Sequence, residues 1–435
     1  MAVRTSATIS AMFRPARMRA AMPRVWSRAS VPLAAIVAGG FALRAATIAA
    51  GPGYPFDIVT FQRWAARMAA GGPPAFYDPS QFADYPPGLL YILWPLGMWP
   101  GGPPSWALRA ISIPFDLAIA VALFALVSRI RDRRDALNVS ALYSLNPALA
   151  LAGPFWGQVD AVAMLPLLLS LVAAAARRFA LAGVLAALAA LVKPQAAIAL
   201  AVLVIAGLAI GAKRGTWRPL LLTVAAAAVT AVLAFAPFVP TPEKIAALVR
   251  DATSPHPFSS LFAFNIWALA TGFAVPDETP ILGIPIRLWG VLSVGVVLAL
   301  IAVRLWALVP RNVGSSDFVH DLATLLAAST LVAVATYELP TRIHERYLFA
   351  VFAVLAPFVG LSRRATAAYV IFTVVLALSV LFSFTHQEQT GVRAPDVVER
   401  TLFDPSVLVV VILAGLGAAI ALVTLWARRS PAVAP

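Results

Sequence analysis

Long apolar stretches constrain the fold of this chain more than any other feature. Hydrophobic residues make up 61% of its 435 residues and charged residues 12%, which is about half the charged share of a typical soluble domain. A helix of about 20 apolar residues is long enough to cross a bilayer. The sequence therefore predicts an all-α, polytopic integral membrane protein and excludes soluble enzyme folds.

Hydropathy predicts about twelve transmembrane helices. The apolar segment 86–99 is shorter and contains Pro86, Pro87 and Pro95, so we expect it to form a re-entrant or interfacial helix instead. The predicted spans are 30–50, 106–128, 138–152, 160–176, 179–192, 195–211, 219–239, 284–308, 318–338, 347–361, 364–384 and 405–427.

The basic residues predict the orientation of these spans, because short cytoplasmic loops collect Lys and Arg. With the N-terminus inside, 21 of the 33 Lys and Arg residues fall in cytoplasmic segments. Both termini are then cytoplasmic. Counting 86–99 as a span would place the Arg129–Arg134 cluster outside. The distribution of basic residues along the chain thus explains the net charge of +14 by membrane orientation, and we expect no nucleic-acid partner.

The predicted organisation has three parts. Residues 1–29 form a basic cytoplasmic tail, which we expect not to be cleaved, because the following apolar run is long and lacks a small-residue cleavage site before Arg44. Residues 30–361 form the main transmembrane module. Residues 362–435 form C-terminal transmembrane helices.

Two long outer loops, 51–105 and 240–283, contain more aromatic and charged residues than a simple connector needs. Within the first, apolar residues recur at helical spacing after Asp57. This pattern predicts a short amphipathic helix on the membrane surface, starting near Asp57. The apolar residues are Ile58, Phe61, Trp64, Ala65 and Met68.

Polar residues that lipid-facing helices do not need gather at the predicted outer surface. This one-sided placement favours a single site at one face over a transporter, whose ionisable groups lie near the midplane. Helices that begin near Asp160, Pro194 and 344–347 would direct their positive N-termini at the same layer, which suits a lipid phosphate. The polar residues are Asp57, Asp84, Gln158, Asp160, Lys193, His256, Asn265, Glu338, Arg342, His344, Glu345 and Arg346.

These residues also have structural interpretations. Asp57 could cap the surface helix, and Lys193 could extend to the membrane interface. His256 could be an ordinary loop histidine. Four charged residues near the end of one span could neutralise one another, namely Glu338, Arg342, Glu345 and Arg346.

Two further patterns bear on charge and metals. Arg109 and Asp116 lie seven residues apart on one helical face, which predicts a structural pair. The chain has no cysteine, and its four histidines are scattered, so no metal-ligand pattern is present in the sequence. The histidines are His256, His320, His344 and His386.

Several short motifs follow one another along residues 50–350. They are Asp57–Trp64, Asp84-Tyr85-Pro86-Pro87-Gly88, Asn146-Pro147, Gly157-Gln158-Val159-Asp160, Lys193-Pro194-Gln195, Phe264-Asn265-Ile266-Trp267 and His344-Glu345-Arg346. In this order they resemble the GT-C superfamily of glycosyltransferases. The resemblance is greatest to the asparagine-linked-glycosylation glucosyltransferases, the GPI mannosyltransferase I group and their bacterial relatives.

The resemblance implies a GT-C-like fold and an inverting glycosyltransferase. The donor would be a polyprenyl-phosphate hexose, with mannose favoured over glucose, and the acceptor a glycolipid, a glycan or a protein. The reaction would occur at the outer face of the membrane, which we expect to be a bacterial cytoplasmic membrane.

The resemblance also assigns roles to residues. Asp57 is the implied catalytic base. Lys193, Arg342, His344 and Arg346 are the implied ligands of the donor phosphate, and the implied sugar- or loop-positioning residues are Asp84, Gln158, Asp160, His256, Asn265 and Glu345. Many GT-C enzymes have a second acidic residue where this chain has Val59. The metal-independent branch is therefore the better analogue, and we expect no cofactor.

Two other classes of protein remain possible from the sequence. One is a lipid-carrier flippase or transporter without transferase activity, although the inner halves of the predicted spans contain few polar residues. The other is an O-antigen ligase or polymerase, which would use a lipid diphosphate donor. Dependence on a lipid monophosphate or a lipid diphosphate separates the last class from the proposed transferase.

Overall fold

The fold is seen in a computed structural model that describes residues 22–253, 256–309 and 317–427. Helices account for 75% of the structure, and the described strands form one short hairpin, so the all-α prediction is confirmed. The hairpin pairs β1 (Pro280–Ile281) with β2 (Ile284–Pro285). Residues 1–21 and 428–435 lie outside the described residues, and with them most of the predicted basic tail.

Eight helical segments of the described chain are long and apolar enough to cross a membrane, and each matches a predicted span. They are α2 (Met22–Ala49), α5 and α6 together (Ser105–Ala110 and Ser112–Val127), η3 with α11 (Pro194–Ala197 and Ile198–Arg214), α12 with η4 (Arg218–Phe235 and Ala236–Phe238), α15 (Ile286–Leu308), α16 (Phe318–Glu338), α18 (Arg363–His386) and α20 (Pro405–Ala427).

Three other predicted spans form shorter apolar helices. These are α9 (Asp160–Ala175), α10 (Phe179–Val192) and α17 (Phe349–Leu355), which continues into η6 (Ala356–Phe358). The predicted interfacial segment forms α4 (Pro87–Gly97), whose 11 residues reach only about 16 Å. That length is too short to cross a bilayer alone.

The predicted span 138–152 is interrupted. It is divided among α7 (Arg133–Ser144), α8 (Pro147–Ala150) and the π-helical turn η2 (Leu151–Phe155). The break follows from Pro147, which has no N–H and disfavours helical backbone in the residue before it. Asn146 is accordingly extended, and its side chain accepts a hydrogen bond from the N–H of Ala148.

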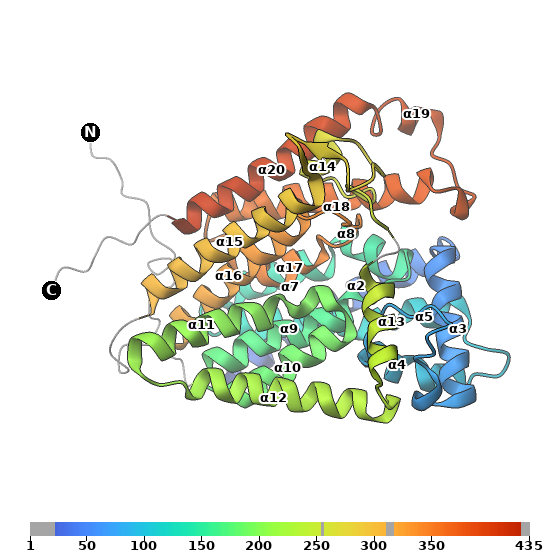
Figure 1. The fold of residues 1–435 in the computed structure, drawn as a ribbon. Helices are drawn as coiled ribbons and strands as arrows, with labels where there is room; N and C mark the ends of the chain where they lie inside the picture. The colour runs from blue at the N-terminus through green and yellow to red at the C-terminus, as the bar shows by residue number, and fades with distance from the viewer. Residues whose placement is uncertain (1–21, 254–255, 310–316, 428–435) are drawn as a thin grey trace.

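The segments predicted to lie outside the membrane form short elements at one end of the bundle. In Figure 1, α3 and α13 run across the direction of the long helices α10, α11 and α12 at this end. The elements here are α3 (Pro55–Gly71), η1 (Pro73–Ala75), α13 (Pro242–Thr253), α14 (Ile266–Ala270), η7 (Glu388–Thr390) and α19 (Asp396–Glu399).

Burial divides the long helices into central and peripheral ones. α16 is the most buried of the candidate spans, because 72% of the residues in its apolar stretch are buried inside the protein. The corresponding share is 11% in α12 and in α15. Val232 of α12 and Val303 of α15 are about two-thirds exposed. Because large exposed apolar faces are unfavourable in water, these peripheral faces are suited to contact lipid.

A buried ion pair near the N-terminal helices differs from the predicted one. Asp116 of α6 pairs with Arg44 of α2 at 3.0 Å, and Tyr143 donates to the same carboxylate at 3.1 Å. Arg109 instead donates to backbone carbonyls, including those of Thr47 at 2.9 Å and Pro154 at 2.7 Å. The predicted Arg109–Asp116 pair is therefore wrong, because α2 brings Arg44 closer. Both residues nevertheless have structural roles.

Candidate active site

Asp57 lies in the first turn of α3, close to the predicted helix start. The helix begins at Pro55, and its N-cap is Tyr54, so Asp57 is not the capping residue. The buried face of α3 consists of the predicted apolar stripe, from Ile58 to Met68. The stripe packs inward and leaves Asp57 in the lining of a cavity.

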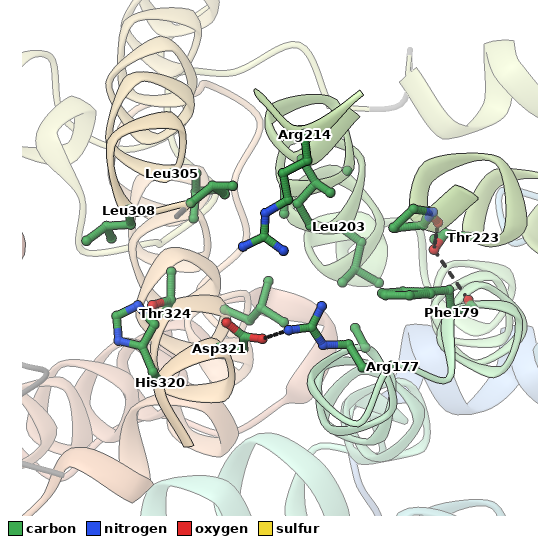
Figure 2. Close-up of a pocket in the computed structure, with 17 residues that line it drawn as sticks. Arg177, Phe179, Leu203, Arg214, Thr223, Leu305, Leu308, His320, Asp321 and Thr324 are labelled. Carbon is green, nitrogen blue, oxygen red and sulfur yellow. Dashed lines mark hydrogen bonds and ion pairs between the residues drawn. The ribbon is translucent and has the colours of Figure 1, made fainter. Parts of the chain in front are cut away.

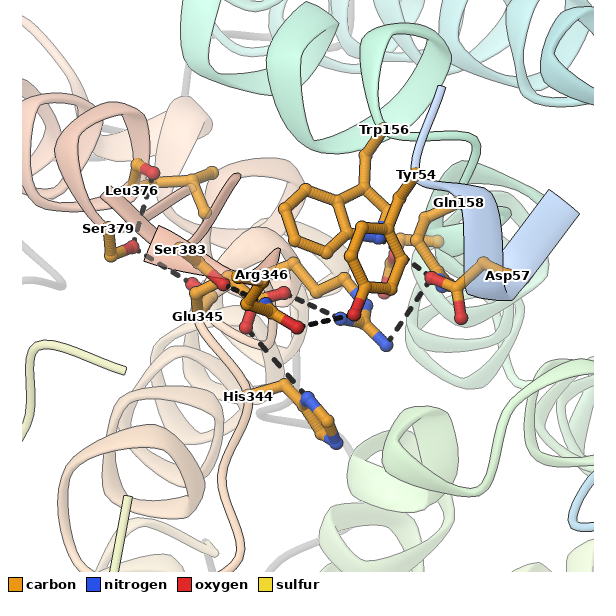
Figure 3. A network of polar contacts seen from close by, with 12 residues as sticks. Tyr54, Asp57, Trp156, Gln158, His344, Glu345, Arg346, Leu376, Ser379 and Ser383 are labelled. Atoms are coloured by element: carbon orange, nitrogen blue, oxygen red, sulfur yellow. Dashed lines mark hydrogen bonds and ion pairs between the residues drawn. The ribbon is translucent and has the colours of Figure 1, made fainter. Parts of the chain in front are cut away.

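The Asp57 carboxylate is held through one of its two oxygens. Oδ2 accepts hydrogen bonds from Nε1 of Trp156 at 2.7 Å and from Nε2 of Gln158 at 2.5 Å. Within the described ranges no hydrogen bond reaches Oδ1, and Figure 3 shows the second oxygen directed away from these donors. One carboxylate oxygen is thus fixed and the other is left for a ligand.

A buried chain of polar groups supports Gln158 from behind. Lys193 donates from Nζ to Oε1 of Gln158 at 3.0 Å and pairs with Asp160 at 2.7 Å. Lys193 is 1% exposed, so its side chain does not extend to the interface as the alternative interpretation requires. This ammonium group fixes the amide of Gln158 with the NH₂ group directed at Asp57.

The local backbone explains how Gln158 reaches α3. Gly157 has a φ of +106°, in the region that favours glycine. A Cβ at this position would lie 2.6 Å from Cδ1 of Ile58. Glycine therefore allows both the turn between η2 and α9 and the close approach to α3.

Arg346 contributes a cation beside Asp57. Its Nη1 lies 2.5 Å from Oε1 of Glu345, and its Nη2 lies 3.8 Å from Oδ2 of Asp57. The guanidinium group lies over the ring of Trp156, with Cζ 5.5 Å from the ring centroid. Burial disfavours ionisation of Glu345, but the adjacent Arg346 outweighs it, with help from His344, and lowers the pKa of Glu345 to about 2.

The predicted four-residue ion cluster forms only in part. Glu345 and Arg346 pair, but Arg342 instead pairs with the fully buried Asp277, at 2.7 Å. Glu338 is 2% exposed, and neither of its carboxylate oxygens has a hydrogen-bond partner in the part of the chain described. The charges near the end of α16 are therefore distributed between two separate pairs and one isolated carboxyl group.

Two histidines of the cavity lining are in contact with each other. The rings of His256 and His344 lie 5.4 Å apart. Burial lowers the pKa of His256 to about 4, and the neighbouring His344 contributes to the shift. The pKa of His344 is lowered by burial and then by Arg346. Both shifts favour the neutral imidazole, which can exchange hydrogen bonds with an uncharged hydroxyl group.

These groups surround a cavity of about 230 Å³. Seven of the eleven predicted site residues line it, which are Asp57, Asp84, His256, Arg342, His344, Glu345 and Arg346. The other four lie outside the lining. Gln158, Lys193 and Asp160 form the chain behind Asp57, and Asn265 caps α14 while donating to the carbonyl of Tyr337 at 3.2 Å.

The predicted convergence of helix N-termini is partly present. α9 begins at Asp160 and η3 begins at Pro194, as expected. The third helix, α17, begins at Phe349, after a turn that contains Glu345 and Arg346. At that third position the cation of Arg346, rather than a helix end, lies next to Asp57.

Sequence reasoning missed three groups at this site. Trp156 holds Asp57, and Tyr54 stacks on Trp156 with ring centroids 4.4 Å apart. Gln387, at the end of α18, lines the cavity and accepts a hydrogen bond from the hydroxyl of Tyr54. Of these three residues, only Trp156 had a signal in the sequence, namely its position directly before Gly157-Gln158. Gln387 reaches the site through tertiary contact, which local sequence does not indicate.

Asp84 gives a pH-dependent prediction for this cavity. Burial raises the pKa of Asp84 to about 7, opposed by its backbone hydrogen bond and assisted by Asp57. Between the unfolded value near 4 and about 7, the folded chain binds an extra proton, so this contribution to the free energy of unfolding falls as pH rises. From about pH 5 to about pH 8, we expect the wild type to lose more thermal stability than Asp84→Asn. Melting curves that run parallel would contradict this assignment.

The described residues contain no group of three or more His, Asp or Glu side chains arranged to hold a metal ion. Any contribution of a metal to the reaction is therefore best tested directly by chelation.

The fold and the site together define a helical membrane protein with a charged cavity at one end of its bundle. The sequence profile of glycosyltransferase family 87 matches residues 82–336, more than half of the chain. The chain belongs to this family of membrane-embedded, GT-C-like glycosyltransferases. No curated protein sequence matches it. The matched region includes Asp84, Gln158 and Lys193 but neither Asp57 nor Arg346.

Proposed function

We propose that this glycosyltransferase transfers a hexose, with inversion, from a polyprenyl-phosphate donor to an acceptor hydroxyl group. The observation that carries the proposal is the pair formed by Asp57 and Arg346. A carboxylate with one oxygen fixed and one open to the cavity lies 3.8 Å from a buried guanidinium group. The first group suits a general base, and the second suits the phosphate that leaves.

The chemistry follows from this pair. The open oxygen of Asp57 takes the proton of the acceptor hydroxyl as that hydroxyl oxygen attacks the anomeric carbon. The bond from the anomeric carbon to the phosphate oxygen breaks on the opposite face, and polyprenyl phosphate leaves with the bonding electrons. Arg346 stabilises the charge that develops on this phosphate. A double displacement would need a second carboxylate in the cavity to attack the anomeric carbon as a nucleophile. Glu345 is held by Arg346, and burial raises the pKa of Asp84 to about 7, so neither suits that role and a single displacement with inversion is favoured.

The remaining assignments refine this proposal. Arg342 and His344 line the cavity and would contact the donor phosphate on the side away from Arg346. Lys193 would position Asp57 indirectly, by holding the amide of Gln158. Asp84, His256 and Glu345 would position the sugar or the loops around it. We place the site at the outer face of the membrane, because the basic loops favour a cytoplasmic location for the opposite end of the bundle. The family relationship disfavours the flippase alternative.

The test is a transfer assay with purified protein in lipid and a crude acceptor extract. The donors are radiolabelled polyprenyl-phosphate-mannose, polyprenyl-phosphate-glucose and the corresponding diphosphate-linked sugars. We expect turnover of the mannosyl monophosphate, a product of inverted anomeric configuration, and no effect of EDTA.

Each other outcome of this assay changes a specific part of the proposal. Turnover of the glucosyl monophosphate alone would replace the sugar and keep the mechanism. Turnover of diphosphate donors alone would overturn the assignment of the donor. A product that retains the anomeric configuration would overturn the role of Asp57 as the base of a single displacement.

A further inference from the structure

A second cavity lies at the end of the bundle opposite Asp57. It has a volume of about 80 Å³ and is lined by residues of α9, α10, α11, α12, α15 and α16 (Figure 2). α9 begins beside the Asp57 cavity, and its far end lines this second cavity. Its 16 residues span about 24 Å, so the two cavities are separated by a distance close to the thickness of a hydrocarbon layer.

The floor of this cavity is apolar. It is formed by residues such as Leu203, Ala206, Leu305 and Leu325. The neighbouring helices α12 and α15 present largely exposed apolar faces beside it. A hydrocarbon chain that follows these faces can therefore enter the cavity without leaving an apolar environment.

The rim of the same cavity is basic. Arg177, Arg214, His320 and Asp321 are its charged or titratable lining residues. Arg177 pairs with Asp321 at 2.8 Å. With two arginines and one aspartate among these lining residues, the rim is formally basic. Figure 2 shows the guanidinium groups of Arg177 and Arg214 directed toward the centre of the cavity from opposite walls.

We propose that this cavity binds an anionic glycerophospholipid, with the headgroup phosphate between Arg177 and Arg214 and an acyl chain against the apolar floor. Basic pockets between transmembrane helices at a membrane surface recognise lipid headgroups in this way, and guanidinium groups match the geometry of phosphate oxygens. The apolar floor selects a lipid over a free anion, and the basic rim selects an anionic lipid over a zwitterionic one. The site is separate from the proposed transfer chemistry.

The test is lipid retention by the full chain in detergent micelles, measured by native mass spectrometry. Phosphatidylglycerol and phosphatidylcholine with the same acyl chains are the two probes. We expect wild type to retain phosphatidylglycerol at a concentration roughly tenfold lower than phosphatidylcholine, as one charge-assisted contact provides. Arg214→Gln should remove this preference, whereas Arg134→Gln, which changes an exposed arginine outside the cavity, should preserve it.

A second variant separates lipid binding from folding. Ala206→Phe fills the apolar floor and leaves every charge in place, so it should weaken retention of both lipids by a similar factor. Equal retention of the two lipids by wild type would overturn the proposal. So would unchanged phosphatidylglycerol retention in both variants. Displacement of phosphatidylglycerol by millimolar inorganic phosphate would show a site for free anions and would overturn it as well.

Discussion

Asp57→Asn is expected to reduce sugar transfer by about 100- to 10,000-fold, the usual contribution of a general base. The substitution preserves the size of the side chain and removes the proton acceptor. Trp156 and Gln158 lose a charged acceptor at the same time, so the new amide is also held less firmly. The measurement is the initial rate of transfer from the donor identified by the assay above, at saturating donor concentration.

Asp78→Asn is the matched control for this prediction. Asp78 belongs to the same segment, 51–105, but is exposed, and its carboxylate accepts hydrogen bonds from Ser80 in a local turn. We expect its variant to transfer sugar at the wild-type rate. Equal rates for Asp57→Asn and wild type would remove Asp57 from the mechanism. A melting temperature of Asp57→Asn close to that of wild type would show that its lower rate comes from the chemical step and not from unfolding.

Arg346→Gln is expected to reduce the rate by about 100- to 1,000-fold, the typical effect of removing one group that stabilises transition-state charge. Arg342→Gln should have a smaller effect, under about tenfold, because Arg342 is tied to Asp277 and its side chain is 35% exposed. The comparison is made on the same donor, with the rate at saturation and the donor KM measured separately. A transition-state contact predicts a loss mainly in the rate at saturation.

Arg346 has a buried partner, so a fold control is needed. Removing Arg346 alone leaves Glu345 without its closest cation, and breaking a buried pair in this way costs about 3–5 kcal/mol. The double variant Glu345→Gln/Arg346→Gln removes both charges. We expect it to recover most of the lost stability and none of the lost rate. Recovery of the rate in the double variant would mean that Arg346 serves only to neutralise Glu345.

Periodic patterns predicted the helices of this protein well. The apolar stripe of α3 and eight long spans follow directly from local sequence, because burial on one helix face or contact with lipid leaves a repeating signature. The interrupted span at Asn146-Pro147 was missed, because hydropathy averages over a proline whose effect is on backbone geometry. At this position hydropathy predicts a continuous span, whereas the stereochemistry of proline predicts a break.

Pair contacts were predicted less well than helices. Arg109 and Asp116 share a helix face, yet Asp116 pairs with Arg44, which is 72 residues away in the chain. Lys193 was expected near phosphate or at the interface, whereas it lies inside with Asp160 and Gln158. Trp156 was not selected at all, because an aromatic residue in an apolar segment has no sequence signature of its hydrogen bond. Such contacts depend on tertiary packing, which a single sequence does not contain.

The position of Asp57 and Arg346 outside the matched region 82–336 has a consequence for protein engineering. A chimera that exchanged only residues 82–336 with a distant homologue would take from that homologue most helices around the cavity and the residues that hold Gln158. Its base and its guanidinium group would still come from the host. Recombination boundaries for this protein therefore belong before Tyr54 and after Gln387, so that the stacked and hydrogen-bonded ends of the site travel together.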